Sequence, residues 1–196
     1  MAKLYYQGHG SYRITAADGT VIYVDPFAGD GYELPADLIL VTHQHRDHNK
    51  IELVTQKPGC SVITNFEALA GGTHNSFDSH GVHIQSVMAK NLMHNPKKCV
   101  GYLITVDDTK IYASGDTSTT DQMKDFAALK LDYALLPIDG IFNMGPDEAA
   151  KAAALIGAAH NIPVHMKPGA LFDRAKAEKF TAPNRIIIEP GQEIDL

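Results

Sequence analysis

Three histidines and one aspartate lie within six residues, at His43, His45, Asp47 and His48. Residues two apart in an extended segment point the same way, so His43 and His45 can chelate one ion, and the turn that follows can aim Asp47 and His48 at a second. Imidazole and carboxylate groups suit zinc, iron or manganese, and a set without cysteine favours an open catalytic site over a closed structural one. The alternative is a polar surface loop, which would explain a single histidine better than this cluster.

Two later segments join this cluster in a pattern that resembles a known family. The spacing His43-x-His45-x-Asp47-His48 resembles the signature of the metallo-β-lactamase superfamily. Gly115-Asp116-Thr117 resembles the family's step whose aspartate bridges two metals, and the run ending in His165 resembles its late strand that ends in a histidine ligand. The order and spacing of all three match over nearly the whole chain.

Finer motifs resemble one branch of that superfamily, the small cytoplasmic metal-dependent hydrolases, a branch that itself resembles L-ascorbate-6-phosphate lactonase. These motifs are Gly8-His9-Gly10-Ser11, Asp25-Pro26-Phe27, Leu136-Pro137-Ile138-Asp139-Gly140 and the segment 143–150. Each motif is unspecific alone, and together with the metal signature they favour this branch.

The resemblance implies two divalent cations and a set of protein ligands for them. Zinc is the expected metal, with manganese or iron as alternatives. The first cation would be held by His43, His45 and His94, the second by Asp47, His48 and His165, and both by Asp116. His94 is chosen over His74, His80 and His83 because it precedes Asn95-Pro96, where relatives carry a histidine.

Four further residues are expected to contact the substrate: His9, Lys90, Asp139 and Lys167. The last three stand where the family pattern has other residues, which puts the substrate in question and leaves the metal site intact. For His9, a role behind the ligands or in a turn is equally compatible with the sequence. Asp25 and Asp37 are candidates either to orient ligand imidazoles or to serve as ordinary cap or turn residues.

The chemistry implied by the resemblance is hydrolysis by a metal-activated bridging hydroxide, with Asp47 orienting it and passing a proton to the leaving group. The substrate would be a small ester, lactone or phosphoester. Arg46, Lys90, Lys97, Lys98 and Lys167 form either an anion-binding rim or ordinary solvated surface. Alternatives to this function are a phosphodiesterase acting on a small phosphodiester, an iron-dependent redox enzyme, and a non-catalytic metal-binding protein on the same fold.

The rest of the chain must supply the strands that bring these residues together. Alternating or β-branched runs predict strands at 3–6, 11–16, 20–24, 38–41, 61–64, 82–88, 100–106, 110–113, 133–136, 162–164 and 185–188. Helices are expected over 50–56, from Thr119 or Thr120 to Leu129, and from Pro146 to Gly157 or His160. This rhythm suggests two mixed sheets packed face to face with helices outside. The resemblance sharpens it to an α/β, four-layer αββα sandwich.

Length and charge fit a single small domain. The 196 residues form one expected domain, 1–196, with a net charge of −6, which argues against nucleic acid as the main partner. No export signal or membrane-length apolar run is visible, and Cys60 and Cys99 are expected to be free thiols in a reducing compartment, so the expected location is cytoplasmic. A small molecule is the expected partner, and the resemblance suggests assembly into a homo-oligomer.

Overall fold

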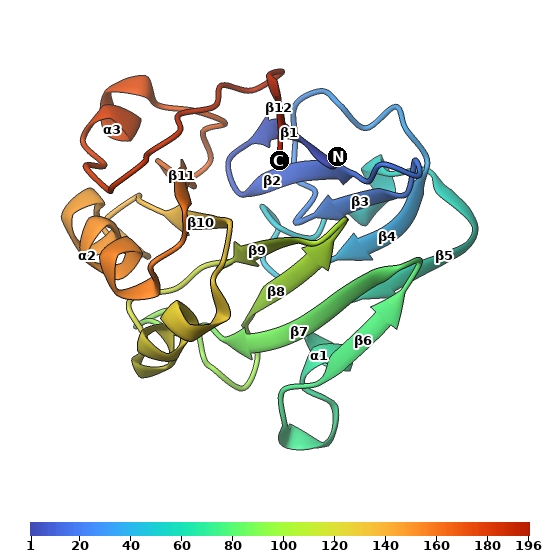
Figure 1. Ribbon diagram of the computed structural model, residues 1–196, viewed down its shortest axis with the longest axis horizontal. Helices are drawn as coiled ribbons and strands as arrows, with labels where there is room; N and C mark the ends of the chain where they lie inside the picture. Colours follow the sequence, from blue (N-terminus) through green and yellow to red (C-terminus); the bar gives the residue numbers. More distant parts are fainter.

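The computed structural model describes residues 1–196 as two six-stranded sheets that face each other (Figure 1). The first sheet has the order β12-β1-β2-β3-β4-β5 and the second the order β11-β10-β9-β8-β7-β6. The strands of the first sheet are β1 (Lys3–Gly8), β2 (Ser11–Thr15), β3 (Val21–Val24), β4 (Ala36–Leu40), β5 (Gln56–Ile63) and β12 (Glu193–Asp195). Those of the second are β6 (Ser76–Ser79), β7 (Val82–Met88), β8 (Val100–Val106), β9 (Thr109–Ala113), β10 (Tyr133–Pro137) and β11 (His160–Val164).

Both sheets are mixed, and they share one pairing pattern. In the first sheet, β12, β1, β2 and β3 pair antiparallel, whereas β3, β4 and β5 pair parallel. In the second, β6, β7, β8 and β9 pair antiparallel, whereas β9, β10 and β11 pair parallel. Each sheet therefore presents the carboxyl ends of three parallel strands, and loops leaving such ends commonly carry binding groups.

The central core lies between the two sheets and follows the two-residue period of the strands. In β10, Tyr133 and Leu135 face this core, while Ala134 and Leu136 face the other way. Strand β4 is buried on both faces in the same manner, as its uninterrupted apolar sequence predicts.

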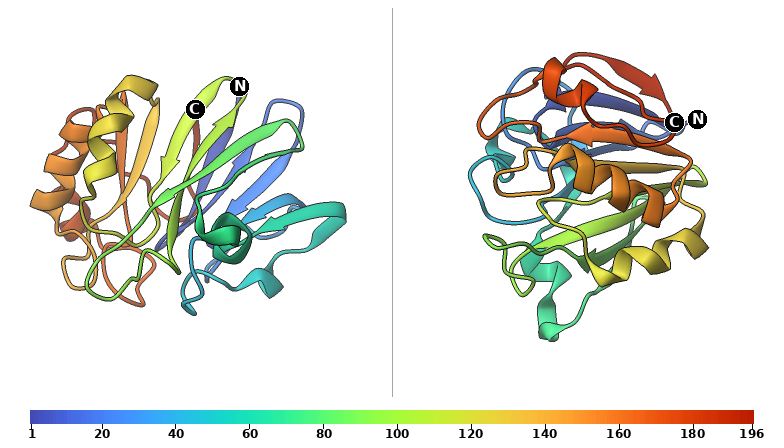
Figure 2. Two further views of the ribbon diagram at one scale, coloured as in Figure 1. Left: turned by 90° about the horizontal axis from the view of Figure 1, so that it is seen from below. Right: turned by 90° about the vertical axis from the view of Figure 1, so that its left-hand side faces the viewer.

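Helices cover the outer face of the second sheet, where α2 (Pro146–Ile156) and the 3-10 helix η3 (Asp121–Leu129) pack together (Figure 2). The helix α2 starts as predicted, with Pro146 in its first turn, and ends at Gly157, whose φ of 69° suits glycine. The outer face of the first sheet is covered more thinly, by the 3-10 helix η1 (Ile51–Leu53) and the segment around Tyr32. Short helices η2 (Ala70–Gly72), α1 (Asn65–Ala68) and α3 (Arg174–Glu178) complete the chain. The expected αββα order is therefore confirmed, with unequal helical layers.

The helices and the two cysteines can be compared with what the sequence predicts. None of the helices has the length and apolar character needed to cross a membrane. Cys60 and Cys99 are both free thiols, as expected.

Two predicted elements are wrong. The helix expected over 50–56 is only the single turn η1, and β5 begins at Gln56 and runs through Pro58. Because β5 is the edge strand of its sheet, a proline that cannot donate a hydrogen bond is tolerated there. The strand expected at 185–188 is reduced to one bridge between Asn161 and Arg185, and β12 closes the first sheet instead. Strand β6 and helices α1 and α3 were not predicted.

A buried hydroxyl ties the two sheets together just before the histidine cluster. The Tyr102 hydroxyl, on β8, donates to the Val41 carbonyl at 3.0 Å, at the end of β4. Tyr102→Phe should lower the free energy of unfolding by about 1–2 kcal/mol because a buried carbonyl loses its donor. Urea denaturation measures this. Tyr133→Phe is the matched control, since its hydroxyl makes only a 3.5 Å contact, and an equal loss in both variants would contradict the assignment.

Candidate metal centre

The residues expected to do chemistry meet at one edge of the sandwich. Most of them follow the carboxyl ends of the parallel strands: Asp25 after β3, His43 to His48 after β4, Asp116 after β9, Asp139 after β10 and His165 after β11. His94 comes from the loop between β7 and β8, and His9 from the turn between β1 and β2. Both sheets therefore contribute to the same site.

The first cluster consists of His43, His45 and His94, whose nearest side-chain nitrogens all lie within 4.8 Å of one another. The Nδ1 atom of His45 is 3.1 Å from Nε2 of His94. Asn91 accepts a hydrogen bond from Nδ1 of His94 at 2.8 Å, which leaves Nε2 of that ring free to face the cluster. Asn91 was not predicted from sequence. Its position three residues before the candidate ligand His94 is a signal that could have identified it as a hydrogen-bond partner of that ring.

Of the four later histidines, the structure places His94 in this cluster. His83 contacts Asp78, His80 contacts the Gly59 carbonyl, and His74 lies near Ser86. All three are exposed on the surface, whereas His94 is buried beside His45.

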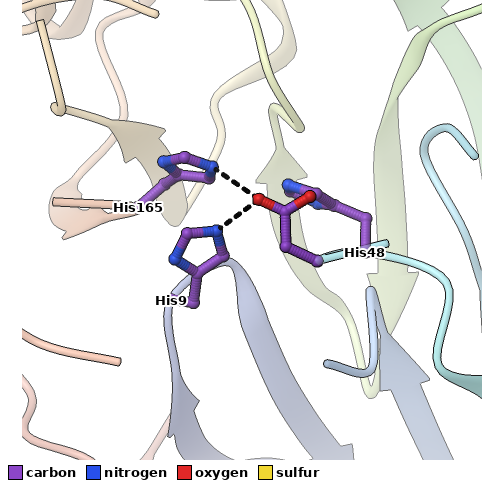
Figure 3. A group of neighbouring side chains, drawn as sticks. His9, His48 and His165 are labelled. Carbon is purple, nitrogen blue, oxygen red and sulfur yellow. Dashed lines mark hydrogen bonds and ion pairs between the residues drawn. The ribbon is translucent and has the colours of Figure 1, made fainter. Parts of the chain in front are cut away.

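The second cluster consists of Asp47, His48, His165 and also His9, again with one side-chain atom each within 4.8 Å of the others. The Oδ2 atom of Asp47 lies 3.8 Å from Nε2 of His165 and 3.1 Å from Nε2 of His9 (Figure 3). These atoms arrive from both sheets, so the cluster forms only when the sandwich is assembled.

Asp116 lies between the two clusters. Its Oδ2 atom is 3.3 Å from Nε2 of His94 and 3.5 Å from Nε2 of His165, and its Oδ1 atom is 3.3 Å from Nε2 of His48. Gly115 makes this position accessible: its φ is +60°, and a Cβ there would lie 2.9 Å from Cβ of Thr42. A carboxylate so placed can contact two neighbouring cations.

Outer partners fix the orientation of the inward-facing rings. Nδ1 of His43 lies 3.0 Å from the Thr42 hydroxyl, which itself donates to Asp25 and therefore accepts from His43. Nδ1 of His48 donates to Oδ2 of Asp25 at 2.8 Å, and Nδ1 of His165 lies 3.1 Å from Oδ2 of Asp139. With the proton on Nδ1, a neutral ring presents its Nε2 lone pair to the centre.

Four of the inward-facing atoms have no hydrogen-bond partner. Nε2 of His43, His48 and His165 and Oδ1 of Asp116 are buried and unpaired. Unpaired buried polar atoms are costly, so several within 4 Å of one another call for an occupant that accepts lone pairs. A divalent cation meets this requirement, and this donor set of imidazoles and carboxylates suits zinc, manganese or iron.

The pKa values of two candidate ligands, His43 and His48, are shifted in opposite directions by burial and by neighbouring charges. Burial, with repulsion from neighbouring histidines, lowers the pKa of His43 far below its usual value, so the ring is neutral. Burial also opposes a charge on His48, but Asp116 and Asp25 outweigh it and raise the pKa of His48 to about 9. The carboxylates at this edge therefore favour positive charge in the centre: without a cation His48 carries that charge, and a cation bound there would displace the proton from Nε2 of His48.

Of the two aspartates left open from sequence, only Asp25 contacts a candidate ligand. Besides His48, its carboxylate accepts from the backbone N–H of Thr42 at 2.7 Å. Asp37 instead accepts from Val21 and Lys57 at the other end of its strand.

The four residues expected to contact substrate are placed unevenly. His9 and Asp139 are buried behind Asp47 and His165 and have no exposed surface of note. The Asp139 carboxylate is occupied by three backbone N–H groups of residues 141–143 and by the Asn143 amide. Lys90 and Lys167 are exposed, and neither lines a hollow beside the histidines.

Two hollows open beside the clusters, with His45 and Met93 on the ridge between them. One, of about 300 Å³, gives access to Asp47, and its lining is His45, Arg46, Asp47, Met93, His94, Asp116, Phe142, His165 and Pro168. The other, of about 610 Å³, lies against His43 and His45 and includes Phe66, Leu69, Lys97 and Lys98. Both adjoin candidate ligands, so a small molecule in either would lie next to a candidate ligand.

Comparison with known proteins identifies the family. A model of the beta-lactamase superfamily domain matches residues 3–165. The chain belongs to the metallo-β-lactamase superfamily. Within this superfamily it belongs with the UPF0173 metal-dependent hydrolases: one from Thermococcus onnurineus is 31% identical over 100% of both chains, and one from Thermus thermophilus is 32% identical over 84% of each.

Solved structures agree with the metallo-β-lactamase fold. The metallo hydrolase Igni18 from Ignicoccus hospitalis superposes with a TM-score of 0.76 at 22% identity, covering 98% of this chain and 97% of that one. The superfamily resemblance and the fold predicted from sequence are thereby confirmed, and metal-dependent hydrolysis is the activity of the family.

Replacing the carboxylate behind His48 should weaken metal binding. Asp25→Asn keeps the size of the side chain but removes the charge that orients His48, and such outer partners typically contribute about 10- to 100-fold in metal affinity. We expect a loss of that size in zinc affinity, measured by competition with a chelator. Asp37→Asn is the control, and a variant Asp25→Asn that binds zinc as tightly as the original would refute the role.

Proposed function

We propose that the protein is a hydrolase of small esters, lactones or phosphoesters that uses two divalent cations, with zinc as the expected metal. His43, His45 and His94 would hold one cation, Asp47, His48 and His165 the other, and Asp116 would contact both. The observation that carries this proposal is the set of buried, unpaired Nε2 and Oδ1 atoms facing one centre. When bound there, divalent cations polarise the scissile group and lower the pKa of water.

Asp47 is the residue we propose for proton transfer. Its side chain is 31% exposed and lines the smaller hollow, so it can reach both the centre and a bound substrate. Burial alone would raise its pKa, but the hydrogen bond from His9 and attraction to His48 lower the pKa below the usual range. An ionised Asp47 can accept a proton from the attacking water and return it to the leaving oxygen.

The larger hollow supports an anionic substrate with an apolar part. Lys97 and Lys98 form no ion pair with any carboxylate, and no acidic side chain lines this hollow. Phe66, Leu69 and Met93 contribute apolar surface to the same hollow. This arrangement suits a carboxylated or phosphorylated small molecule bound next to His43 and His45.

The fold alone does not choose among substrates. Structures that share it at 13–17% identity include an isothiocyanate hydrolase, a diphosphatase of the PhnP family and a diiron β-hydroxylase. A screen of lactones, esters, thioesters and small phosphodiesters with the zinc- and manganese-loaded protein separates lactonase or esterase activity from phosphodiesterase activity. Oxygen consumption by the iron-loaded protein would instead favour redox chemistry.

Removing the Asp47 carboxylate tests the proposed chemistry. Asp47→Ala should lower kcat/KM for the best substrate of the screen by at least about 10²- to 10⁴-fold, because a general base and a ligand are lost together. Asp125→Ala, an exposed change on η3, is the control. Full activity in the Asp47→Ala variant, with unchanged metal content, would contradict the assignment.

Replacing the two lysines tests the anionic substrate. The double variant Lys97→Ala/Lys98→Ala should raise KM about 2- to 20-fold for an anionic ester, as expected from two exposed charge contacts, while leaving KM for a matched neutral ester unchanged. The double variant Lys124→Ala/Lys130→Ala, remote from the hollow, is the control. Equal KM changes for the anionic and neutral esters would argue against recognition of charge.

A further inference from the structure

His9 is held rigidly beneath Asp47 by bonds to both sheets. The side chain has no exposed surface. The backbone N–H of His9 donates to the Leu171 carbonyl at 2.6 Å, and its carbonyl accepts from His165 N–H at 2.7 Å and from the Tyr6 hydroxyl at 2.8 Å. Its φ of 58° is uncommon for a residue with a side chain. The turn between β1 and β2 therefore places this ring with little freedom.

Both ring nitrogens of His9 face oxygen acceptors. Nδ1 lies 3.0 Å from the Ala170 carbonyl. Nε2 lies 3.1 Å from Oδ2 of Asp47 (Figure 3). A carbonyl oxygen and a carboxylate oxygen only accept, so the ring donates to Asp47 in its Nε2–H tautomer and to Ala170 in its Nδ1–H tautomer.

This pairing separates His9 from the other histidines of the second cluster. Nε2 of His48 and of His165 has no hydrogen-bond partner, as expected of atoms that bind a cation. Nε2 of His9 is already bonded to Asp47, although it lies as close to the centre as they do. No other side chain donates a hydrogen bond to the Asp47 carboxylate.

We propose that His9 is a positioning residue whose Nε2–H holds the Asp47 carboxylate in the orientation that hydrolysis requires, while His9 itself contacts neither metal nor substrate. This inference rests on the proposed function of Asp47. It also gives the Gly8-His9-Gly10 motif a physical reason: the turn must bring the ring under Asp47, and a Cβ at Gly10 would lie 3.1 Å from the His48 ring. The motif thus connects the first turn of the chain to the histidine cluster.

Two amide substitutions separate the two hydrogen bonds of the ring. In His9→Gln, the amide can occupy the place of Nε2 and still donate to Asp47. In His9→Asn, the shorter amide can occupy the place of Nδ1 and donate to Ala170 but cannot reach Asp47, and asparagine tolerates the positive φ. His83→Ala, which removes an exposed histidine on β7, is the control for the loss of an imidazole.

We expect His9→Asn to lower kcat about 10- to 100-fold with KM nearly unchanged, and His9→Gln to stay within about 3-fold of the original protein. Both variants should bind as many zinc ions as the original, measured by elemental analysis. The visible spectrum of the cobalt-loaded protein should change in His9→Asn and not in His9→Gln, because Asp47 loses its orientation only in the former.

Three results would overturn the proposal for His9. The loss of a zinc ion from both variants would make His9 a ligand. A rise in KM with kcat intact would make it a substrate contact. An unchanged kcat in His9→Asn would leave His9 without a role. The original protein tests the proposed function separately: if it neither binds zinc nor hydrolyses any ester, the proposed function is wrong. If it is fully active and both variants are unaffected, only the proposal for His9 is contradicted. Thermal unfolding of both variants verifies that each is folded.

Discussion

The structure depends on one electrostatic constraint: lone pairs of several buried imidazoles and carboxylates converge on a small volume from which water is largely excluded. Each such atom is costly without a partner, and repulsion among like lone pairs adds to the cost. Outer hydrogen bonds hold the rings in this arrangement. Thr42, Asp25 and Asn91 accept the Nδ1 protons of His43, His48 and His94, so that the Nε2 atoms of these rings face inward. A cation bound at the centre would remove this cost, and its binding free energy would then also stabilise the fold.

The sandwich architecture explains how distant residues come to share this volume. Each sheet ends its three parallel strands at the same edge, and the loops that follow carry Asp25 and the His43 to His48 segment from one sheet and Asp116, Asp139 and His165 from the other. The backbone bond from His165 to the His9 carbonyl and the Tyr102 hydroxyl join the two sheets beside the site. The stability of the sheet packing and the geometry of the centre are therefore coupled.

Much of the site could be predicted from sequence because part of it is local. His43 to His48 are contiguous, so their spacing after a buried strand was informative, whereas Asp116, His94 and His165 were found only through the family pattern. Asn91 and the hydrogen-bonded role of His9 depend on contacts between distant segments, which periodicity does not encode.

The same limit explains the errors in the predicted fold. Residues 50–56 have helical composition, but Gln56 and the residues after it pair with β4 and form an edge strand. Strand β12 is too short to be recognised from its sequence pattern.

Anomalous diffraction at the zinc absorption edge, from a crystal grown with excess zinc, tests the central claim most directly. The account predicts two peaks: one about 2.0–2.3 Å from the side-chain nitrogens of His43, His45 and His94, and a second at the same distances from Asp47, His48 and His165, with Asp116 between them. Rings that turn away from one another, with no peak in the space they enclose, would contradict it.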